Sequence, residues 1–381
     1  MVASNSELLK NVKTFNIRFG FVGYDMMGKY WPIVSRQATN LQEVCIFGFR
    51  IYVPDDQADG HENVWSDLLG GEHCGSHGRV INIFANLRIL HIWSSKQPVS
   101  ELDAAMRLPA LSCLLLGSVY QILPIKDWTI FKSSSNIKSL DIQYCYMDSE
   151  VVAQLLCYIE TLKTFRYTHG SSDEYAKSMG KPKFSWSALS DDLGLHQSSL
   201  SEICLHGVTD QEIYANFTGE SGYGMLGSLR GFSELRSVDV ALHILTNLAH
   251  DNTDLTELLP SNLGIFATCL DYDELDPRYC ANALESLKEV LTRGADRELN
   301  LTLEKYSPYG QLRLSGALQA LMDAGINKRV SRYDEFECIS LDTLRLMKVD
   351  GYEDSLSGDE MEVSEEDFND DDEEEWDYDE E

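Results

Sequence analysis

The sequence predicts an α/β solenoid, in which short parallel strands form one curved sheet and helices and loops cover its convex side. The first observation is a six-residue phrase, apolar-x-x-apolar-x-apolar, that recurs along the chain. Full copies begin at Leu41, Leu87, Leu111, Ile137, Leu162, Leu200 and Leu235, and looser copies begin at Val12 and Leu263. The second observation is that successive copies begin 24 to 46 residues apart, enough for one strand and a returning helix or loop. Such units bury their apolar edges only when they stack on one another.

Each phrase is expected to end in a strand. Its last three positions alternate between apolar and other residues, as they do in a strand that buries one face. We therefore expect parallel strands to start near residues 12, 41, 87, 111, 137, 162, 200, 235 and 263. Leu90, Leu140 and Ile203 should lie in these strands and point into the core.

Three segments outside the phrases have helical periodicity. Residues 148–160 begin at a cap-like Asp148, residues 279–293 are followed by a glycine, and residues 311–323 also stop before one. Two polar stretches, at about 53–80 and 170–183, are interpreted as insertions between repeats.

Charge divides the chain into two parts. The net charge is −31, and 19 of the 62 acidic residues lie in 350–381, which contains no Lys or Arg. A segment with so many like charges and few apolar residues repels itself too strongly to fold alone. We expect an irregular solenoid over 1–349 and a disordered acidic tail over 350–381.

The amino-acid composition limits which kinds of partner and which cellular compartment are expected. The acidic balance does not favour nucleic acid, since binding its phosphates needs a basic surface. No apolar run approaches the roughly 20 residues of a membrane span, and the first residues lack the apolar stretch of a secretory signal. The nine cysteines are scattered singly and form no CxxC, which is typical of reduced, buried thiols. We expect a cytoplasmic or nuclear protein that does not bind membranes.

One phrase extends into a longer pattern. The pattern LxxLxLxx(N/C)xL is matched in full by Ile137-Lys-Ser-Leu140-Asp-Ile142-Gln-Tyr-Cys145-Tyr-Met147. This is the phrase of leucine-rich repeats, and the chain resembles that family over roughly residues 12–303. It is most similar to the irregular repeat region of fungal F-box-type proteins, in which segments such as Leu259-Pro-Ser-Asn-Leu263 introduce a strand.

The resemblance implies a non-catalytic scaffold for protein–protein interaction, acting like a substrate receptor, with ubiquitin-ligase components among its partners. The chain departs from the pattern in two respects. Only Cys145 supplies the Asn or Cys that bonds the turn backbone in this family, so we expect irregular curvature. The F-box itself is not visible before Val12, so the resemblance concerns the repeats alone.

The sequence predicts no enzyme and no cofactor. It contains no Gly-x-Ser-x-Gly, no P-loop and no His-Glu-x-x-His. The dinucleotide fingerprint is spelled by Gly222-Tyr-Gly224-Met-Leu-Gly227, but polar loop residues precede it and the next phrase begins at Leu235. That spacing leaves no room for the helix whose N-terminus would hold a pyrophosphate, so a loop is the better interpretation.

A possible metal site falls in the first insertion. His61, His73, Cys74 and His77 are residue types that bind transition metals. No second cysteine pair completes a known pattern, and the surrounding glycines favour a solvated loop. We therefore expect no metal site, and an enzyme with a metal in this loop is the least favoured alternative.

The expected binding surface is the concave face of the sheet. The apolar residues of each phrase point into the core, so the intervening residues line the opposite face. We expect a protein partner, of unknown identity, to contact Arg18, Phe47, His91, Trp93, Asp141, Gln143, Arg166, His206 and Asp239. The alternative is that the acidic tail binds basic proteins such as histones.

Overall fold

A computed structural model describes the chain at residues 9–19, 38, 40–48, 84–94, 102–117, 119–121, 132–169, 184–206, 224–240, 242–245, 254–271, 287, 298–304 and 327–329. Both predicted insertions, the helix predicted at 311–323 and the tail at 350–381 lie outside the described residues. The helix predicted at 279–293 is described only at Leu287, which is helical and buried.

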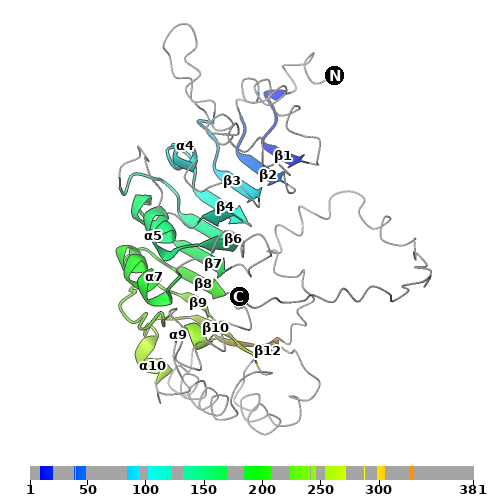
Figure 1. Cartoon of the computed structure of the whole chain (residues 1–381). Coiled ribbons are helices and arrows are strands. Elements are labelled where there is room, and N and C mark those ends of the chain that lie inside the picture. The colour runs from blue at the N-terminus through cyan, green and yellow to red at the C-terminus, as the bar shows by residue number, and fades with distance from the viewer. Residues whose placement is uncertain are drawn as a thin grey trace, which may run out of the picture. The chain divides into compact units, whose positions relative to one another are not determined.

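One parallel sheet runs through the described residues (Figure 1). Its strands are stacked in chain order, β1-β2-β3-β4-β6-β7-β8-β9-β10-β11-β12, and the short β5 pairs with the end of β6. The strands that the phrases predict are β1 (Thr14–Phe19), β2 (Glu43–Gly48), β3 (Ile89–Ser94), β4 (Cys113–Gly117), β6 (Ser139–Met147), β7 (Thr164–His169), β8 (Glu202–His206), β9 (Ser237–Val240) and β10 (Ile265–Asp271). All nine are confirmed as parallel strands, and each begins two residues after the first apolar residue of its phrase.

Three strands were not predicted. They are β5 (Tyr120–Gln121), β11 (Glu298–Glu304) and β12 (Asn327–Arg329). β11 has alternating leucines but lacks the apolar residue that begins a phrase, since Asp296 stands three positions before Leu299. The sheet therefore continues beyond the last recognisable repeat.

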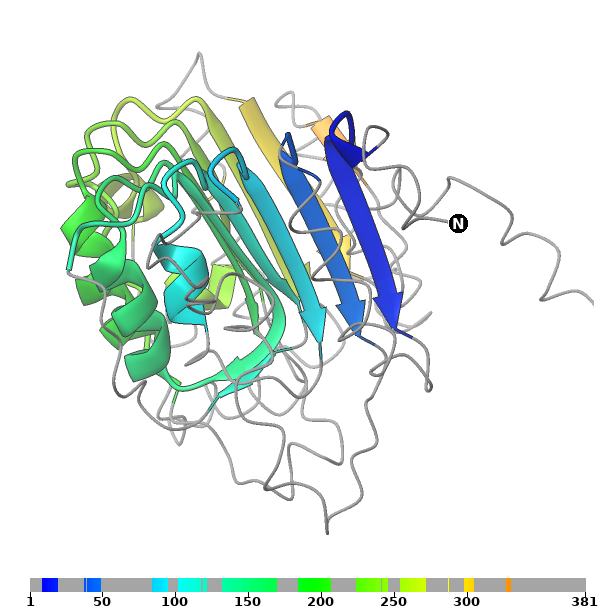
Figure 2. The ribbon, with the colours of Figure 1, turned by 90° about the horizontal axis from the view of Figure 1, so that it is seen from above.

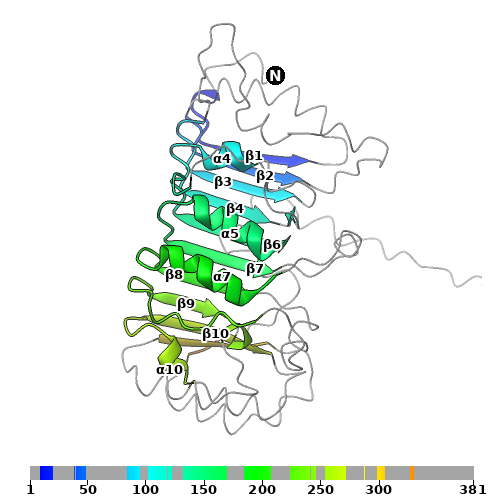
Figure 3. The same ribbon diagram turned by 60° about the vertical axis from the view of Figure 1, so that its left-hand side comes forward.

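Helices cover one face of the sheet (Figures 2 and 3). They are α4 (Asp103–Met106), α5 (Ser149–Tyr158), α7 (Trp186–Leu193), the 3₁₀ helix η4 (Gly194–His196), α9 (Leu242–Leu245) and α10 (Leu255–Leu258). α5 confirms the helix predicted at 148–160, with Asp148 at its N-cap. α7 was not predicted; the Ser185 hydroxyl caps it by accepting a hydrogen bond from the Ala188 amide. No helix in the described part of the chain has the length and apolar character that a membrane span requires.

The core lies between the sheet and the helices. Its first layer is a cross-strand row of completely buried side chains, with Val44, Leu90, Leu114, Leu140, Phe165, Ile203, Val238 and Phe266 in register. A second row, two residues further along each strand, runs from Ile46 to Val240 and is equally buried. Stacking thus gives each repeat the apolar neighbours that it could not supply alone.

Cys145, the cysteine of the full leucine-rich pattern, lies where β6 is irregular. The neighbouring Tyr144 has a φ of 52°, and the register with β7 shifts between Gln143 and Cys145. The buried thiol accepts a hydrogen bond from the Val119 amide at 3.3 Å and lies 3.5 Å from the Leu116 carbonyl oxygen. Cys145 therefore bonds the backbone of the preceding repeat, as the resemblance implies.

Candidate functional site

The face of the sheet opposite the helices, which we call the concave face, carries three cross-strand rows of side chains. Strand alternation produces these rows, because residues two apart on a strand point to the same side. The first row consists of Glu43, Ile89, Cys113, Ser139, Thr164, Glu202 and Ser237. The middle row consists of Cys45, His91, Leu115, Asp141, Arg166, Cys204 and Asp239. The third row consists of Phe47, Trp93, Gly117, Gln143, Thr168 and His206.

The strand register places the predicted contact residues in two of these rows. His91, Asp141, Arg166 and Asp239 belong to the middle row. Phe47, Trp93, Gln143 and His206 belong to the third row, together with Arg18, of which only the backbone is described. Whether a partner contacts them stays a prediction.

Sequence reasoning missed the first row. Glu43 and Glu202 are its charged members, and each is the first residue of its strand. Strand alternation could have revealed it. The residue just before the second apolar position of each phrase points to the same face as the residues of the middle and third rows.

Arg166 and Glu202 form an ion pair across β7 and β8. Glu202 Oε1 accepts hydrogen bonds from Arg166 Nη2 at 2.6 Å and from Nε at 3.0 Å. The two side chains keep 42% and 33% of their surface exposed. The guanidinium is thus held in one position while part of it faces solvent.

Asp141 and Gln143 lie beside this pair but are buried, each with 7% of its surface exposed. Gln143 Nε2 donates a hydrogen bond to Asp141 Oδ2 at 3.0 Å. The other oxygens, Asp141 Oδ1 and Gln143 Oε1, have no hydrogen-bond partner. Burial raises the pKa of Asp141 to about 6, although the nearby positive charge of Arg166 opposes the rise. The centre of the face therefore holds a carboxyl group whose charged form is costly.

Trp93 lies across the neighbouring strand. Gly117, its in-register partner on β4, has no side chain, and the indole fills that space. The indole also contacts the Tyr144 ring, with the ring centroids 6.2 Å apart. A half-buried tryptophan is thereby fixed in orientation on the concave face.

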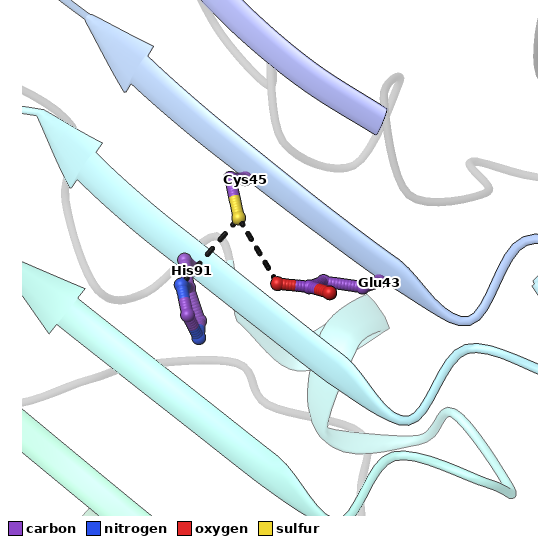
Figure 4. Close-up of side chains that lie close together, drawn as sticks. All are labelled: Glu43, Cys45 and His91. Carbon is purple, nitrogen blue, oxygen red and sulfur yellow. Dashed lines mark hydrogen bonds between the residues drawn. The ribbon is translucent and has the colours of Figure 1, made fainter. Parts of the chain in front are cut away.

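Among the residues that the structure describes, two clusters of metal-ligand residue types occur on the concave face, and each spans two strands. Glu43, Cys45 and His91 form the first (Figure 4). The Cys45 Sγ atom lies 3.6 Å from Glu43 Oε1 and 3.5 Å from His91 Nδ1. Burial and the charge of Glu43 raise the pKa of the Cys45 thiol to about 12, and burial lowers the pKa of His91.

The second cluster consists of Cys204, His206 and Asp239. His206 Nε2 lies 3.2 Å from Asp239 Oδ1, and Cys204 Sγ lies 3.9 Å from Asp239 Oδ2. Burial alone would raise the pKa of Asp239, but the hydrogen bond and positive charge of His206 outweigh it and hold the pKa below its usual value.

The Cys45 cluster lacks the chemistry of a cysteine nucleophile. Such a nucleophile needs a low thiol pKa and a base that a third group orients. Here the thiol pKa is raised, and the Glu43 carboxylate contacts the thiol instead of the imidazole. The neutral thiol and imidazole are therefore not an activated pair. His61, His73, Cys74 and His77 lie outside the described residues, so the expectation for that loop stays a prediction.

A comparison with known protein families gives a match that is consistent with the observed fold. The family model described as a leucine-rich repeat domain matches residues 72–275, more than half of the chain. The chain therefore belongs to the leucine-rich repeat family, whose domains commonly mediate protein–protein interactions and are generally non-catalytic. Searches of the curated proteins and of the solved structures found no match. The closer resemblance to F-box-type proteins stays a prediction.

Proposed function

We propose that the concave face binds a protein partner, without catalysis, through a centre formed by Trp93 and Arg166. The observation that carries the proposal is that both side chains are partly exposed yet fixed by their neighbours. Tryptophan and arginine are enriched among the residues that dominate binding energies. Side chains that are already held in place lose less conformational entropy on binding, so the free-energy cost of binding a partner at this face is smaller.

The charge of the face indicates the chemistry of the partner. The side chains described in its three rows include four carboxylates, and the positive groups that face them are the Arg166 guanidinium and the His206 imidazole; the carboxylates are Glu43, Asp141, Glu202 and Asp239. Complementary charge speeds association and selects partners. We therefore expect the partner to present a basic surface with an apolar contact for Trp93.

The proposal is tested with two ion pairs of the same kind and length. Arg166→Ala with Glu202→Ala removes the pair on the concave face. Arg230→Ala with Glu257→Ala removes an exposed pair away from it, which also has an Nη–Oε distance of 2.6 Å. In quantitative capture from cell extract, the first double variant should lose partners that the second retains. Equal recovery by both variants would contradict the proposal.

The finer proposal is that the chain acts as a substrate receptor, as the F-box-related repeat proteins do. The sequence resemblance alone supports it. Ubiquitin-ligase components should then be recovered with the full chain, and their recovery should not depend on Arg166. If no ligase component is recovered, the receptor role fails while concave-face binding stands.

A second candidate function is tail-dependent binding of basic proteins such as histones. It is favoured by the 19 acidic residues of 350–381, which no Lys or Arg offsets. Deleting 350–381 separates the two candidates. If the tail carries binding, the deletion abolishes capture of histones and the full chain binds them with a steep salt dependence. If the concave face carries binding, the deletion leaves capture unchanged.

A further inference from the structure

The Glu43–Cys45–His91 cluster is produced by the strand register. Glu43 and Cys45 are two residues apart on β2, so they point to the same face. His91 is the in-register partner of Cys45 on β3, although it lies 46 residues further along the chain. The three ligand atoms lie within 4.8 Å of one another. Figure 4 shows Cys45 with His91 and Glu43 beside it. Two stacked strands, rather than a loop, fix the positions of these groups.

Two of the separations in the cluster, both from Cys45 Sγ, match the edges of a tetrahedral metal site. Zinc bonds are about 2.3 Å to sulfur and about 2.0–2.1 Å to nitrogen or oxygen. At tetrahedral angles these lengths separate the sulfur from the other ligand atoms by about 3.5–3.6 Å. The measured separations are 3.5 Å from Cys45 Sγ to His91 Nδ1 and 3.6 Å from Cys45 Sγ to Glu43 Oε1. The two edges that meet at Cys45 Sγ therefore have the lengths of a tetrahedral site, and the Glu43 and His91 ligand atoms lie within 4.8 Å of each other.

Metal ligation requires a thiolate and a neutral imidazole. Burial lowers the pKa of His91, so its imidazole is neutral, as metal ligation requires. The Cys45 thiol carries a proton, since its pKa is about 12, and a bound cation would displace that proton. Binding thus forms a metal–sulfur bond and releases one proton from the thiol, and ligation through Nδ1 requires the imidazole proton to reside on Nε2.

We propose that Glu43, Cys45 and His91 bind one zinc-type divalent transition metal ion on the concave face. Three protein ligands leave the fourth position of a tetrahedral ion for water or for a partner's side chain. Glu43 and His91 are half-buried, so the ion reaches the site from the concave side. The proposal departs from the expected absence of a metal, and it holds whether or not this face binds a protein.

The second cluster provides the comparison site. Its carboxylate is already paired with His206 at 3.2 Å through Oδ1, and its thiol lies 3.9 Å from the other oxygen. An ion that bound there would have to break this pairing. We therefore assign the metal to the first cluster and use the second as a control.

Zinc and cobalt titrations of the full chain test the proposal. The purified protein, stripped with a chelator, should bind one zinc per chain, release protons and gain thermal stability. Cobalt should give the absorption of a thiolate ligand. Glu43→Gln, at a half-buried position, should keep the fold and weaken zinc binding by at least roughly tenfold, because even second-shell partners contribute 10–100-fold. Cys45→Ala should abolish the cobalt–thiolate absorption.

Cys204→Ala is the matched control, since it removes the thiol of the second cluster. The proposal predicts unchanged zinc affinity and unchanged cobalt absorption in this variant. It is overturned if the unaltered chain binds no zinc, if Glu43→Gln binds as tightly as the unaltered chain, or if Cys204→Ala loses the thiolate signal. Zinc binding without any cobalt–thiolate absorption would also overturn it, because the ion would then lie away from Cys45.

Discussion

The indole of Trp93 occupies the space in which a side chain at Gly117 would stand. A Cβ atom built on Gly117 would lie 2.1 Å from Trp93 Cε3, a separation that real atoms do not tolerate. Because Gly117 on β4 has no side chain, the Trp93 indole on β3 can adopt this orientation. This cross-strand relationship gives the concave face its ordered tryptophan.

Gly117→Ala should displace the Trp93 indole. We expect a loss of about 1–3 kcal/mol in the free energy of unfolding, as for overpacking of a filled site. The Trp93 contribution to fluorescence, obtained by comparison with Trp93→Phe, should shift toward that of a solvent-exposed indole. Gly194→Ala is the control, because nothing lies within 4 Å of a Cβ atom there. Unchanged fluorescence in Gly117→Ala would disprove the packing relationship.

Asp141→Asn should stabilise the fold at neutral pH. The folded-state pKa of about 6 lies above the ordinary value of 3.8, so the folded chain binds the proton more tightly than the unfolded chain. The contribution of this group to stability therefore falls as pH rises from about 4 to about 6. One pKa unit corresponds to about 1.4 kcal/mol, so we expect a gain of roughly 1–3 kcal/mol at pH 7.5 in urea unfolding.

Asp239→Asn is the control of opposite sign. The pKa of Asp239 is held below its usual value, so its ionised form stabilises the fold. This variant should lose stability at neutral pH and lose less as the pH falls. A gain in both variants would mean that a general reduction of negative charge, and not the burial of Asp141, explains the effect.

Arg166→Ala should raise the pKa of Asp141 further. The guanidinium lowers that pKa through its positive charge, and its removal leaves burial and Glu202 to raise it. The upper end of the pH range over which stability falls should then move upward in urea unfolding curves measured at successive pH values, while the lower end stays near the ordinary pKa of 3.8. Arg230→Ala, which breaks an exposed pair with Glu257, should leave the range unchanged. Identical curves for the two variants would refute the coupling.

Cys145→Ala should destabilise the fold by about 1–3 kcal/mol, since it leaves the amide of the buried Val119 without its acceptor. Cys157→Ala is the control, at a half-buried helical position where we expect a change within about 0.5 kcal/mol. Thermal unfolding distinguishes the two. Equal effects would show that the hydrogen bond between the Val119 amide and Cys145 makes no specific contribution to stability.

Much of the sheet could be predicted because the phrase encodes the strand directly. The first apolar residue of each phrase stands two positions before its strand, from Val12 to Leu263. β11 lacks that residue, so the phrase does not predict it. α7 is only eight residues long, which is too short to show a sustained helical pattern in the sequence.

The site was less predictable than the sheet. The positions of Trp93 and Arg166 on the concave face follow from alternation within a strand. The contacts that give them their properties join different strands: Trp93 with Gly117, and Arg166 with Glu202. The phrases align these strands, but the contacts also depend on the side-chain conformations of Trp93 and Arg166, which a repeat phrase does not specify.

Site-specific photo-crosslinking is the most direct test of the central claim, that the concave face binds the partner. In one variant a photoreactive residue replaces Thr164, a half-buried neighbour of Glu202 in the first row. In the other variant it replaces Glu150, an exposed residue of α5 on the opposite face. We predict that the probe at Thr164 forms a covalent adduct with a captured protein and that the probe at Glu150 does not. Adducts formed from Glu150 but not from Thr164 would contradict the account.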